Sequence, residues 1–254
     1  MLLQHAPRRI KNICIEFGAE TQPKLVELIN EAKALGIRLQ GASKEELDYR
    51  TENSPHQGIL AECAPKECMS LADFRQQLAK KRKEGLQKES LNDPLVLALD
   101  AVSDPRNLGA IIRVAVAAGV AGILMPKHGS SSLTGVVDRA SAGTLVMAPL
   151  VEVTNLTDAM NALKDDGLWW VGTAVAEEDK EETTQKVQNY TEVDYKGPIG
   201  LVLGSEGRGL RQRVQKNCDF WVTIPMNPQV ESLNVSVATG ILLFEVLRQR
   251  EKRN

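Results

Sequence analysis

The stretch around which this chain is organised reads Ile224-Pro225-Met226-Asn227-Pro228-Gln229-Val230-Glu231-Ser232-Leu233-Asn234-Val235-Ser236-Val237-Ala238-Thr239-Gly240-Ile241-Leu242-Leu243-Phe244-Glu245. It starts as the end of an apolar strand, breaks at two prolines and continues as a helix that we predict over residues 233–250. Apolar residues occupy more than one face of this helix, which predicts burial on several sides, between its own sheet and a partner subunit.

Three polar side chains, Glu231, Ser232 and Asn234, gather where this helix begins. Helix starts leave backbone N–H groups unpaired, so capping alone explains Ser232. It explains Asn234 less well, because Asn234 lies inside the predicted helix, where no cap is needed. From the residues alone, the stretch is equally a candidate site and a candidate interface.

Length and charge limit the possible classes of protein. The 254 residues suffice for one large or two ordinary domains, and the net charge of −2 excludes a polycation. Residues 1–90 hold 15 basic and 13 acidic side chains, whereas residues 91–254 hold 16 and 20. The front of the chain is therefore the part expected to hold a polyanion.

The cysteines and the apolar runs indicate a protein without a metal that is cytoplasmic or the mature form of an organelle protein. The four cysteines form no CxxC pair and the three histidines lie far from them, which predicts free thiols in a reducing compartment. The N-terminus lacks the apolar core of a signal peptide, and no uncharged run is long enough to span a membrane.

The front third alternates strand and helix. Strands are expected at 12–17, 36–40 and 58–62, with a helix at 23–35. Residues 64–93 are polar and helical and contain Lys80-Lys81-Arg82-Lys83, which fits a connector. We predict a front domain over 1–69, a linker over 70–92 and a second domain over 93–254.

The second domain follows a repeating strand–helix pattern. The unbroken apolar run of Leu95 to Leu99 is typical of a strand covered on both faces. Further strands are expected at 122–126, 146–151, 168–174, 199–203 and 220–224, and helices at about 132–142, 155–166, 208–217 and 233–250. This pattern predicts an α/β domain with a mainly parallel sheet.

The segment Asp104 to Arg113 follows one of these strands and begins a helix, where open α/β sheets place ligands. Asn107 is a natural N-cap. Arg113 lies beside the apolar stripe of the helix rather than opposite to it. It is therefore either paired with a buried carboxylate or directed into a cleft, where its five donors suit a phosphate.

The segment Leu201 to Leu210 is a strand, a glycine-rich turn and a helix start. Its glycines, Gly204, Gly207 and Gly209, do not have the GxGxxG spacing, and Glu206 would repel a pyrophosphate. The glycines more readily allow the backbone to approach an uncharged or cationic part of a ligand.

Three motifs together resemble the SpoU family of RNA ribose 2′-O-methyltransferases. They are NxGxxxR (Asn107 to Arg113), LGSEGxG (Leu203 to Gly209) and IPM…SLNVSVA (Ile224 to Ala238), in the family's order and spacing. Residues 1–92 resemble the family's ribosomal-protein-L30-like substrate-binding domain. The resemblance is nearest to the branch that methylates a guanosine of large-subunit ribosomal RNA.

This resemblance implies a SPOUT-type methyltransferase domain with a trefoil knot, S-adenosylmethionine bound in the knot, an RNA substrate and a homodimer. The cofactor positions implied are Thr173, Gly204, Ile224 and Leu233. The implied polar residues of the active site are Asn107, Arg113, Glu206, Ser232 and Asn234. No metal is required.

The sequence departs from the family pattern at two places, and each departure predicts a structural difference. The chain starts at Met1-Leu2-Leu3, inside the family's first helix, so an N-terminally incomplete front domain is expected. Pro228 stands where family members carry glycine; if that position needs a positive φ, the cofactor loop is rearranged. Alternative functions are a tRNA 2′-O-methyltransferase, a non-catalytic RNA-binding protein with the same fold and, more distantly, a nucleotide-dependent oxidoreductase.

Overall fold

The computed structural model describes residues 1–85, 93–174, 187–205 and 209–251. The chain folds as two compact units, residues 1–66 and 67–254. Each unit has its own sheet and its own core, and we describe each by itself.

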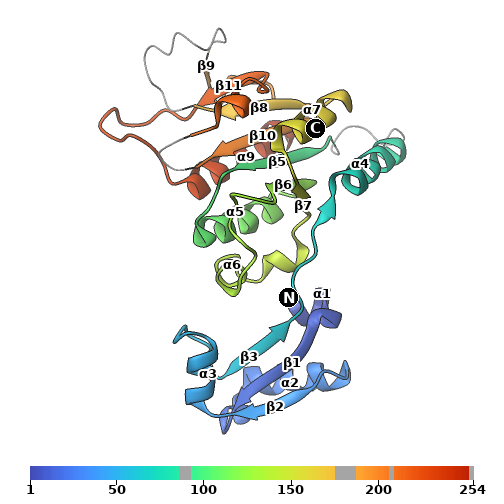
Figure 1. The fold of residues 1–254 in the computed structure, drawn as a ribbon, viewed down its shortest axis with the longest axis vertical. Helices are drawn as coiled ribbons and strands as arrows, with labels where there is room; N and C mark the ends of the chain where they lie inside the picture. The colour runs from blue at the N-terminus through green and yellow to red at the C-terminus, as the bar shows by residue number, and fades with distance from the viewer. Residues whose placement is uncertain (86–92, 175–186, 206–208, 252–254) are drawn as a thin grey trace. The chain divides into compact units, whose positions relative to one another are not determined.

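The front unit is a small α/β fold with a three-stranded sheet (Figure 1). The central strand pairs in parallel with one neighbour and antiparallel with the other. Leu25, Ile29 and Ala32 recur at helical spacing on one helix and pack against the sheet residues Ile13 and Ile15. The elements are α1 (Leu2–His5), η1 (Pro7–Arg9), β1 (Ile10–Glu16), η2 (Ala19–Thr21), α2 (Pro23–Ala34), β2 (Leu39–Ala42), α3 (Lys44–Arg50) and β3 (Ile59–Cys63).

The second unit contains an eight-stranded sheet in the order β4-β7-β6-β5-β10-β8-β11-β9. Every neighbouring pair is parallel, which confirms the predicted α/β class. Its strands are β4 (Met69–Ser70), β5 (Leu95–Asp100), β6 (Gly122–Pro126), β7 (Leu150–Val153), β8 (Trp169–Thr173), β9 (Val187–Asn189), β10 (Ile199–Gly204) and β11 (Phe220–Thr223).

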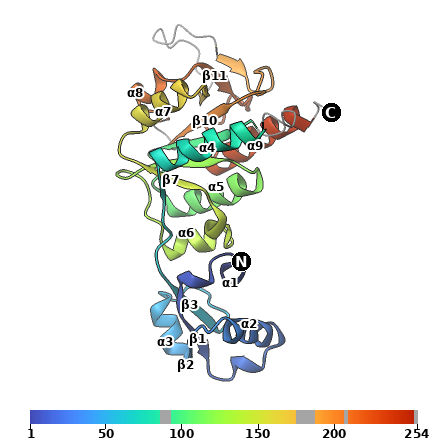
Figure 2. The ribbon, with the colours of Figure 1, turned by 90° about the vertical axis from the view of Figure 1, so that its right-hand side faces the viewer.

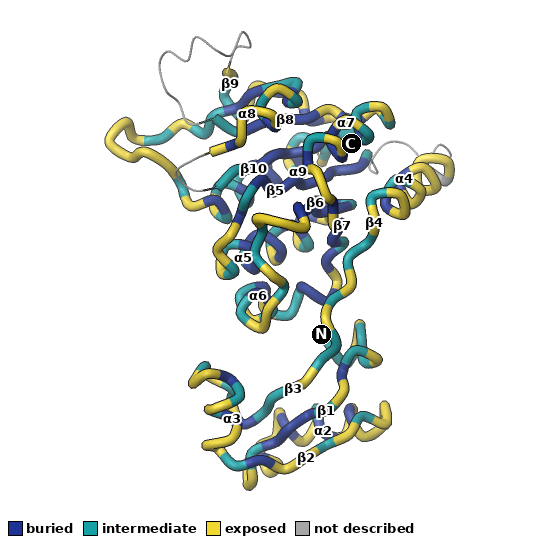
Figure 3. The backbone as a smooth tube through the Cα atoms, viewed as in Figure 1, coloured by how far each residue is buried: buried dark blue, intermediate teal, exposed yellow. Residues whose placement is uncertain are grey.

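Helices cover both faces of this sheet (Figure 1; Figure 2). The central strand β5 is buried along its whole length (Figure 3), as its unbroken apolar sequence predicts. Leu95, Leu97 and Leu99 face the core of α5, α6 and α9, whereas Val96 and Ala98 face the core of α4, α7 and α8. The helices are α4 (Leu71–Gly85), α5 (Pro105–Ala117), α6 (Gly135–Ala140), η3 (Thr144–Met147), α7 (Leu156–Asp165), α8 (Gln212–Gln215) and α9 (Val235–Glu251).

The region expected as a linker starts with two elements of the second unit. β4 pairs with β7, and α4 buries Phe74 and Leu78 in the second core. The ring of Phe74 packs against Gly122, where any larger residue would clash because its Cβ would lie 2.3 Å from the ring. Arg75 adds a two-point ion pair to Asp166 at 2.6 and 2.8 Å. These contacts attach residues 69–83 firmly to the second unit.

Because residues 69–83 belong to the second unit, their basic side chains do not count toward the charge of the front unit. Residues 1–66 hold nine basic and nine acidic side chains, so the excess counted over residues 1–90 comes from residues 67–90. The run Lys80 to Lys83 lies on α4. Net charge therefore no longer favours the front unit as the part that holds a polyanion.

Three element boundaries differ from the sequence prediction for local reasons. Residues 144–147, partly expected as strand, form the 3₁₀ turn η3 after Gly143 in the left-handed conformation, and β7 starts only at Leu150. Helix α8 is shorter than predicted because the N–H of Arg211 binds the Asp100 carboxylate instead. Helix α9 starts after Asn234 rather than before it.

Candidate active site at the carboxyl edge of the sheet

Three of the four predicted cofactor residues, Thr173, Gly204 and Ile224, lie at one edge of the parallel sheet. The neighbouring strands β10, β8 and β11 end at Gly204, Thr173 and Thr223, and Ile224 follows directly. The strand β5 pairs with β10. From β5 the chain adds β6 and β7 on one side, whereas β8, β10 and β11 lie on the other side. The point between β5 and β10, where the strand order reverses, is where open α/β sheets bind ligands. Leu233 follows on the segment 224–234 and is half-buried.

Gly204 is required by a close backbone approach. A Cβ at this position would lie 2.3 Å from the carbonyl carbon and oxygen of Gly209 and 2.7 Å from the nitrogen of Leu210. Ser205 and Gly209 pair across the loop, and Gly209 adopts a φ of 64° that favours glycine. Gly209 and Leu210 therefore lie against the end of β10, with backbone atoms next to Gly204.

Thr223 carries an unmet hydrogen-bonding group at the same edge. Its Oγ1 is buried and has no partner among the described residues. Buried polar atoms are nearly always paired, so an orphan beside Ile224 suits a ligand that supplies the missing bond. A tight backbone loop and a buried hydroxyl fit a polar, uncharged or cationic cofactor such as S-adenosylmethionine. Thr223 did not stand out in the sequence, since a threonine at a strand end is ordinary.

Asn107 and Asn234, 127 residues apart, meet through their side chains. Nδ2 of Asn234 donates to Oδ1 of Asn107 at 2.9 Å. This bond joins the first predicted motif to the third, at the N-terminal ends of α5 and α9. Two of the expected active-site residues are therefore brought together.

The N-cap role expected for Asn107 was wrong, and so was the expectation that Asn234 lies inside α9 without a capping role. The N-cap of α5 is Asp104, whose carboxylate accepts from the N–H groups of Arg106 and Asn107, so Asn107 lies in the first turn. Asn234 is itself the residue that caps α9, accepting from the N–H and the hydroxyl of Ser236 at 2.9 and 2.5 Å. Asn234 takes the cap position because α9 starts at Val235, two residues later than predicted. Asn234 thus both caps a helix and holds Asn107.

Arg113 lies farther along α5. A second contact joins the two helices: a Cβ added to Gly240 of α9 would lie 3.7 Å from Cγ1 of Val114 on α5. Because Asn107 contacts Asn234 and Val114 contacts Gly240, α5 and α9 run in the same direction. Six residues of helix separate Arg113 from Asn107 by roughly 9 Å along the axis. Arg113 is exposed and forms no ion pair with a described residue, which disfavours the buried-carboxylate alternative.

The remaining predicted residues are exposed or outside the described part of the chain. Ser232 is exposed, and the described residues give its side chain no hydrogen bond. Glu206 lies outside the described residues. No residue of 224–234 adopts a positive φ, so Pro228 fits this loop without strain. Asn227 closes the turn there by accepting from the N–H groups of Gln229 and Val230.

An ion pair between the buried Asp100 and the more exposed Arg211, which the motifs did not indicate, lies beside the second motif. Asp100 ends β5 and is fully buried. Its carboxylate accepts from the N–H of Arg211 at 2.7 Å and from the guanidinium at 2.6 Å, 111 residues away. Arg211 directly follows the loop 205–210, so the pair anchors the far end of that loop. An aspartate that closes a wholly apolar strand was the sequence signal for it.

We expect Asp100→Asn to loosen this loop. The amide loses the charge-assisted bonds, which are worth about 1.5–3 kcal/mol each when buried and less here because the Arg211 side chain is 59% exposed. Chemical denaturation should show a loss of about 1–2 kcal/mol, and cofactor affinity should fall several-fold. Glu152→Gln, an exposed change on β7, is the control. Unchanged cofactor affinity would contradict the anchoring role.

Metal and membrane features are lacking in the part of the chain that the structure covers. Its residues form no group of three or more metal-ligating side chains, and its helices include none long and apolar enough to cross a membrane. The four cysteines form no disulfide with one another. Burial raises the pKa of the Cys218 thiol to about 12, so Cys218 is a packing residue rather than a nucleophile.

Family models match both units. The model described as the SpoU rRNA Methylase family matches residues 94–244, and that described as RNA 2′-O ribose methyltransferase substrate binding matches residues 1–69. Among curated proteins, the 23S rRNA (guanosine-2′-O-)-methyltransferase of Shewanella oneidensis is 43% identical over 98% of this chain and 93% of its own length. The protein of the same name from Coxiella burnetii is 41% identical over 98% and 92%.

Solved structures share the fold. The SpoU methyltransferase AviRb of Streptomyces viridochromogenes, in complex with AdoMet, is 21% identical, with a TM-score of 0.73 over 99% of this chain and 87% of that one. The A. aeolicus TrmH/SpoU tRNA modifying enzyme is 29% identical, with a TM-score of 0.55 over 71% and 86%.

Proposed function

This chain belongs to the SpoU rRNA methylase family, and from this premise we propose that it transfers a methyl group from S-adenosylmethionine to the ribose 2′-hydroxyl of a guanosine in large-subunit ribosomal RNA. The observation that carries the proposal is the meeting of the three motifs at one edge of the sheet. The hydrogen bond between Asn107 and Asn234 joins two of them, and the Asp100–Arg211 pair anchors the third.

The residues at this edge suit the cofactor that the proposal requires. When bound, S-adenosylmethionine supplies an electrophilic methyl group on a positively charged sulfur. Gly204, Gly209 and Leu210 offer backbone groups at close range, and Ile224 and Leu233 offer half-buried apolar contacts. Thr173 and Thr223 add hydroxyls from neighbouring strands, that of Thr223 buried and without a partner among the described residues.

The polar residues of the first and third motifs act on the RNA. A ribose hydroxyl must lose its proton and be held in line with the methyl group. Asn107 and Asn234 fix each other's side chains, Ser232 offers an exposed hydroxyl, and Arg113 an exposed guanidinium. In this proposal the asparagines and Ser232 orient the ribose, and Arg113 either grips the adjacent phosphate or takes the proton.

An assay of the whole chain with labelled S-adenosylmethionine tests the proposal. The substrates are unmodified transcripts of large-subunit rRNA, small-subunit rRNA and a tRNA mixture. We expect label in large-subunit rRNA alone. Label in tRNA alone would favour the tRNA alternative, which the similarity to the A. aeolicus enzyme supports. RNA binding without label in any transcript would favour a non-catalytic RNA-binding protein.

The active form in this proposal is a cytoplasmic homodimer formed through α9. Val237 and Phe244, seven residues apart on this helix, are 51% and 52% exposed, while Val235, Leu242 and Val246 face the core. Residues seven apart lie on one side of a helix, so the exposed pair forms an apolar stripe that a second copy can cover. The trefoil knot implied by the family belongs to the same proposal.

Phe244→Glu tests the α9 interface. If Phe244 is buried in a dimer, an unpaired carboxylate there costs several kcal/mol, and the protein should become monomeric at micromolar concentration. Sedimentation velocity measures this, with Val26→Glu, an exposed apolar position on α2, as the control. A variant that still dimerises would remove α9 from the interface. A variant that is folded, monomeric and fully active would refute a dimer with shared active sites.

A further inference from the structure

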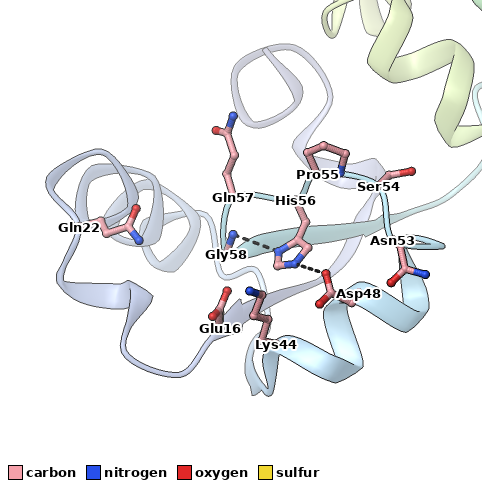
Figure 4. A pocket seen from close by; sticks show the side chains of 10 residues that line it. All are labelled: Glu16, Gln22, Lys44, Asp48, Asn53, Ser54, Pro55, His56, Gln57 and Gly58. Atoms are coloured by element: carbon pink, nitrogen blue, oxygen red, sulfur yellow. Dashed lines mark hydrogen bonds and ion pairs between the residues drawn. The ribbon is translucent and has the colours of Figure 1, made fainter.

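A polar cleft in the front unit lies where the chain leaves β1 and where it returns from α3 to β3 (Figure 4). Its volume is about 580 Å³, within the range of about 300–1,000 Å³ typical of small-ligand sites. The side chains used below are Glu16 at the end of β1, Lys44 and Asp48 on α3, and His56 before β3. None of the site residues above belongs to this cleft.

His56 forms the rigid wall of the cleft. Its side chain is 8% exposed and lies between two partners, as Figure 4 shows. The N–H of Gly58 donates to Nδ1 at 3.1 Å, so the ring proton is on Nε2, which donates to Asp48 at 3.1 Å. Both ring nitrogens are therefore occupied, and His56 holds Asp48 in place.

The charge around the cleft disfavours a phosphate. Glu16 and Asp48 are acidic and Lys44 alone is basic, so the lining has a net charge of −1. Phosphate sites use clustered cations or converging backbone N–H groups instead. The Glu16 carboxylate forms no hydrogen bond or ion pair with the described side chains, and it therefore presents two acceptor oxygens to a ligand.

The surroundings suit an unpaired base of RNA. Phe17 and Tyr49, which follow Glu16 and Asp48 in the sequence, are 71% and 85% exposed on the same unit. Exposed aromatic rings are the groups on which single-stranded bases stack. The match of residues 1–69 to an RNA substrate-binding model agrees with this chemistry.

We propose that this cleft binds an unpaired guanine of the RNA substrate, with its N1–H and N2–H donors on the Glu16 carboxylate and its O6 near Lys44. Guanine alone among the four bases offers two adjacent N–H donors on its Watson–Crick edge, which match the two oxygens of one carboxylate. The proposal rests on the proposed function in that it takes RNA as the substrate.

Binding of short labelled RNA to the whole chain tests the assignment. The probes are uridine heptamers with a central guanosine, inosine or uridine, and the measurement is fluorescence anisotropy at one fixed salt concentration. Inosine lacks the 2-amino group and so removes one of the two bonds. We expect the guanosine probe to bind tenfold to a hundredfold tighter than the other two, the usual worth of a bidentate base contact.

Glu16→Gln should abolish this preference to within about twofold, because the amide keeps the shape but has one acceptor oxygen. Glu27→Gln, an exposed acid on α2 outside the cleft, should keep it. Lys44→Met should weaken the guanosine probe more than the uridine probe. No preference in the wild type, a preference that survives Glu16→Gln, or equal losses in Lys44→Met would each overturn the assignment.

Methyl transfer to rRNA, measured on the same wild-type preparation, separates the two proposals. Normal transfer without guanosine preference overturns the cleft and leaves the proposed function intact. Guanosine preference that depends on Glu16, without transfer to any RNA, supports the cleft and overturns the proposed function.

Discussion

Gly204→Ala is expected to abolish cofactor binding while leaving the fold intact. The new methyl group would lie 2.3 Å from backbone atoms of Gly209, far closer than any side chain tolerates. Because these are backbone atoms, no side-chain rotation relieves the contact. Either the end of β10 or the loop after it must shift, and the Asp100–Arg211 pair anchors that loop. Either shift moves the backbone of Gly204 or Gly209 out of its position at the strand end.

A shift of about 1 Å in a positioned group costs on the order of a hundredfold, so we expect at least this loss of affinity for S-adenosylmethionine by isothermal titration calorimetry. Overpacking should also lower the free energy of unfolding by about 1–3 kcal/mol. Gly135→Ala, where an added Cβ meets only the tip of Arg139 at 3.8 Å, is the matched control. Affinity within threefold of wild type would place the cofactor elsewhere.

Arg113→Ala is expected to reduce turnover by about two to four orders of magnitude with cofactor affinity nearly unchanged. That range is the usual worth of a positioned proton-transfer or charge-stabilising group. Thr173, Gly204 and Ile224 lie at the ends of β8, β10 and β11, whereas Arg113 lies in the later half of α5, about 1.7 turns beyond Asn107. Single-turnover assays with rRNA and calorimetry with cofactor measure the two effects separately.

Arg113→Lys distinguishes the two roles of the guanidinium. An arginine ordinarily stays protonated, with a pKa above about 12, so taking the proton requires a bound substrate that alters its surroundings. Lysine keeps the positive charge but loses the planar two-point grip. Recovery of turnover with lysine at high pH would favour proton abstraction; absence of recovery would favour grip on a phosphate. Near-wild-type turnover in Arg113→Ala would remove Arg113 from the mechanism.

The strands of the second unit could be predicted because burial on both faces leaves a continuous apolar run, as in Leu95 to Leu99. Helix α3 could not be predicted, since its sequence is polar and only Leu47 is buried. The helix α4 was expected within the connector, but its packing against the second sheet was not. Its many charged residues conceal Phe74 and Leu78, whose burial depends on a sheet formed by residues much later in the chain.

The site divides in the same way. Local sequence patterns located Gly204, Asn107 and Asn234 at strand ends and helix starts. Their mutual arrangement depends on contacts over 111 and 127 residues, Asp100 with Arg211 and Asn107 with Asn234, which no local pattern contains. The capping error at Asn234 shows the limit plainly: a shift of the helix start by two residues changes which side chain is the cap.

The chemical position of the transferred methyl group tests the central claim most directly. Large-subunit rRNA methylated by the whole chain is digested to nucleosides and dinucleotides, and mass spectrometry identifies the labelled product. A ribose 2′-O-methyl group blocks alkaline cleavage of the adjoining phosphodiester, whereas a methyl group on a base leaves that bond cleavable. We predict 2′-O-methylguanosine at one site in large-subunit rRNA. Label on a base, label on a ribose other than that of guanosine, or no label in this RNA would contradict the claim.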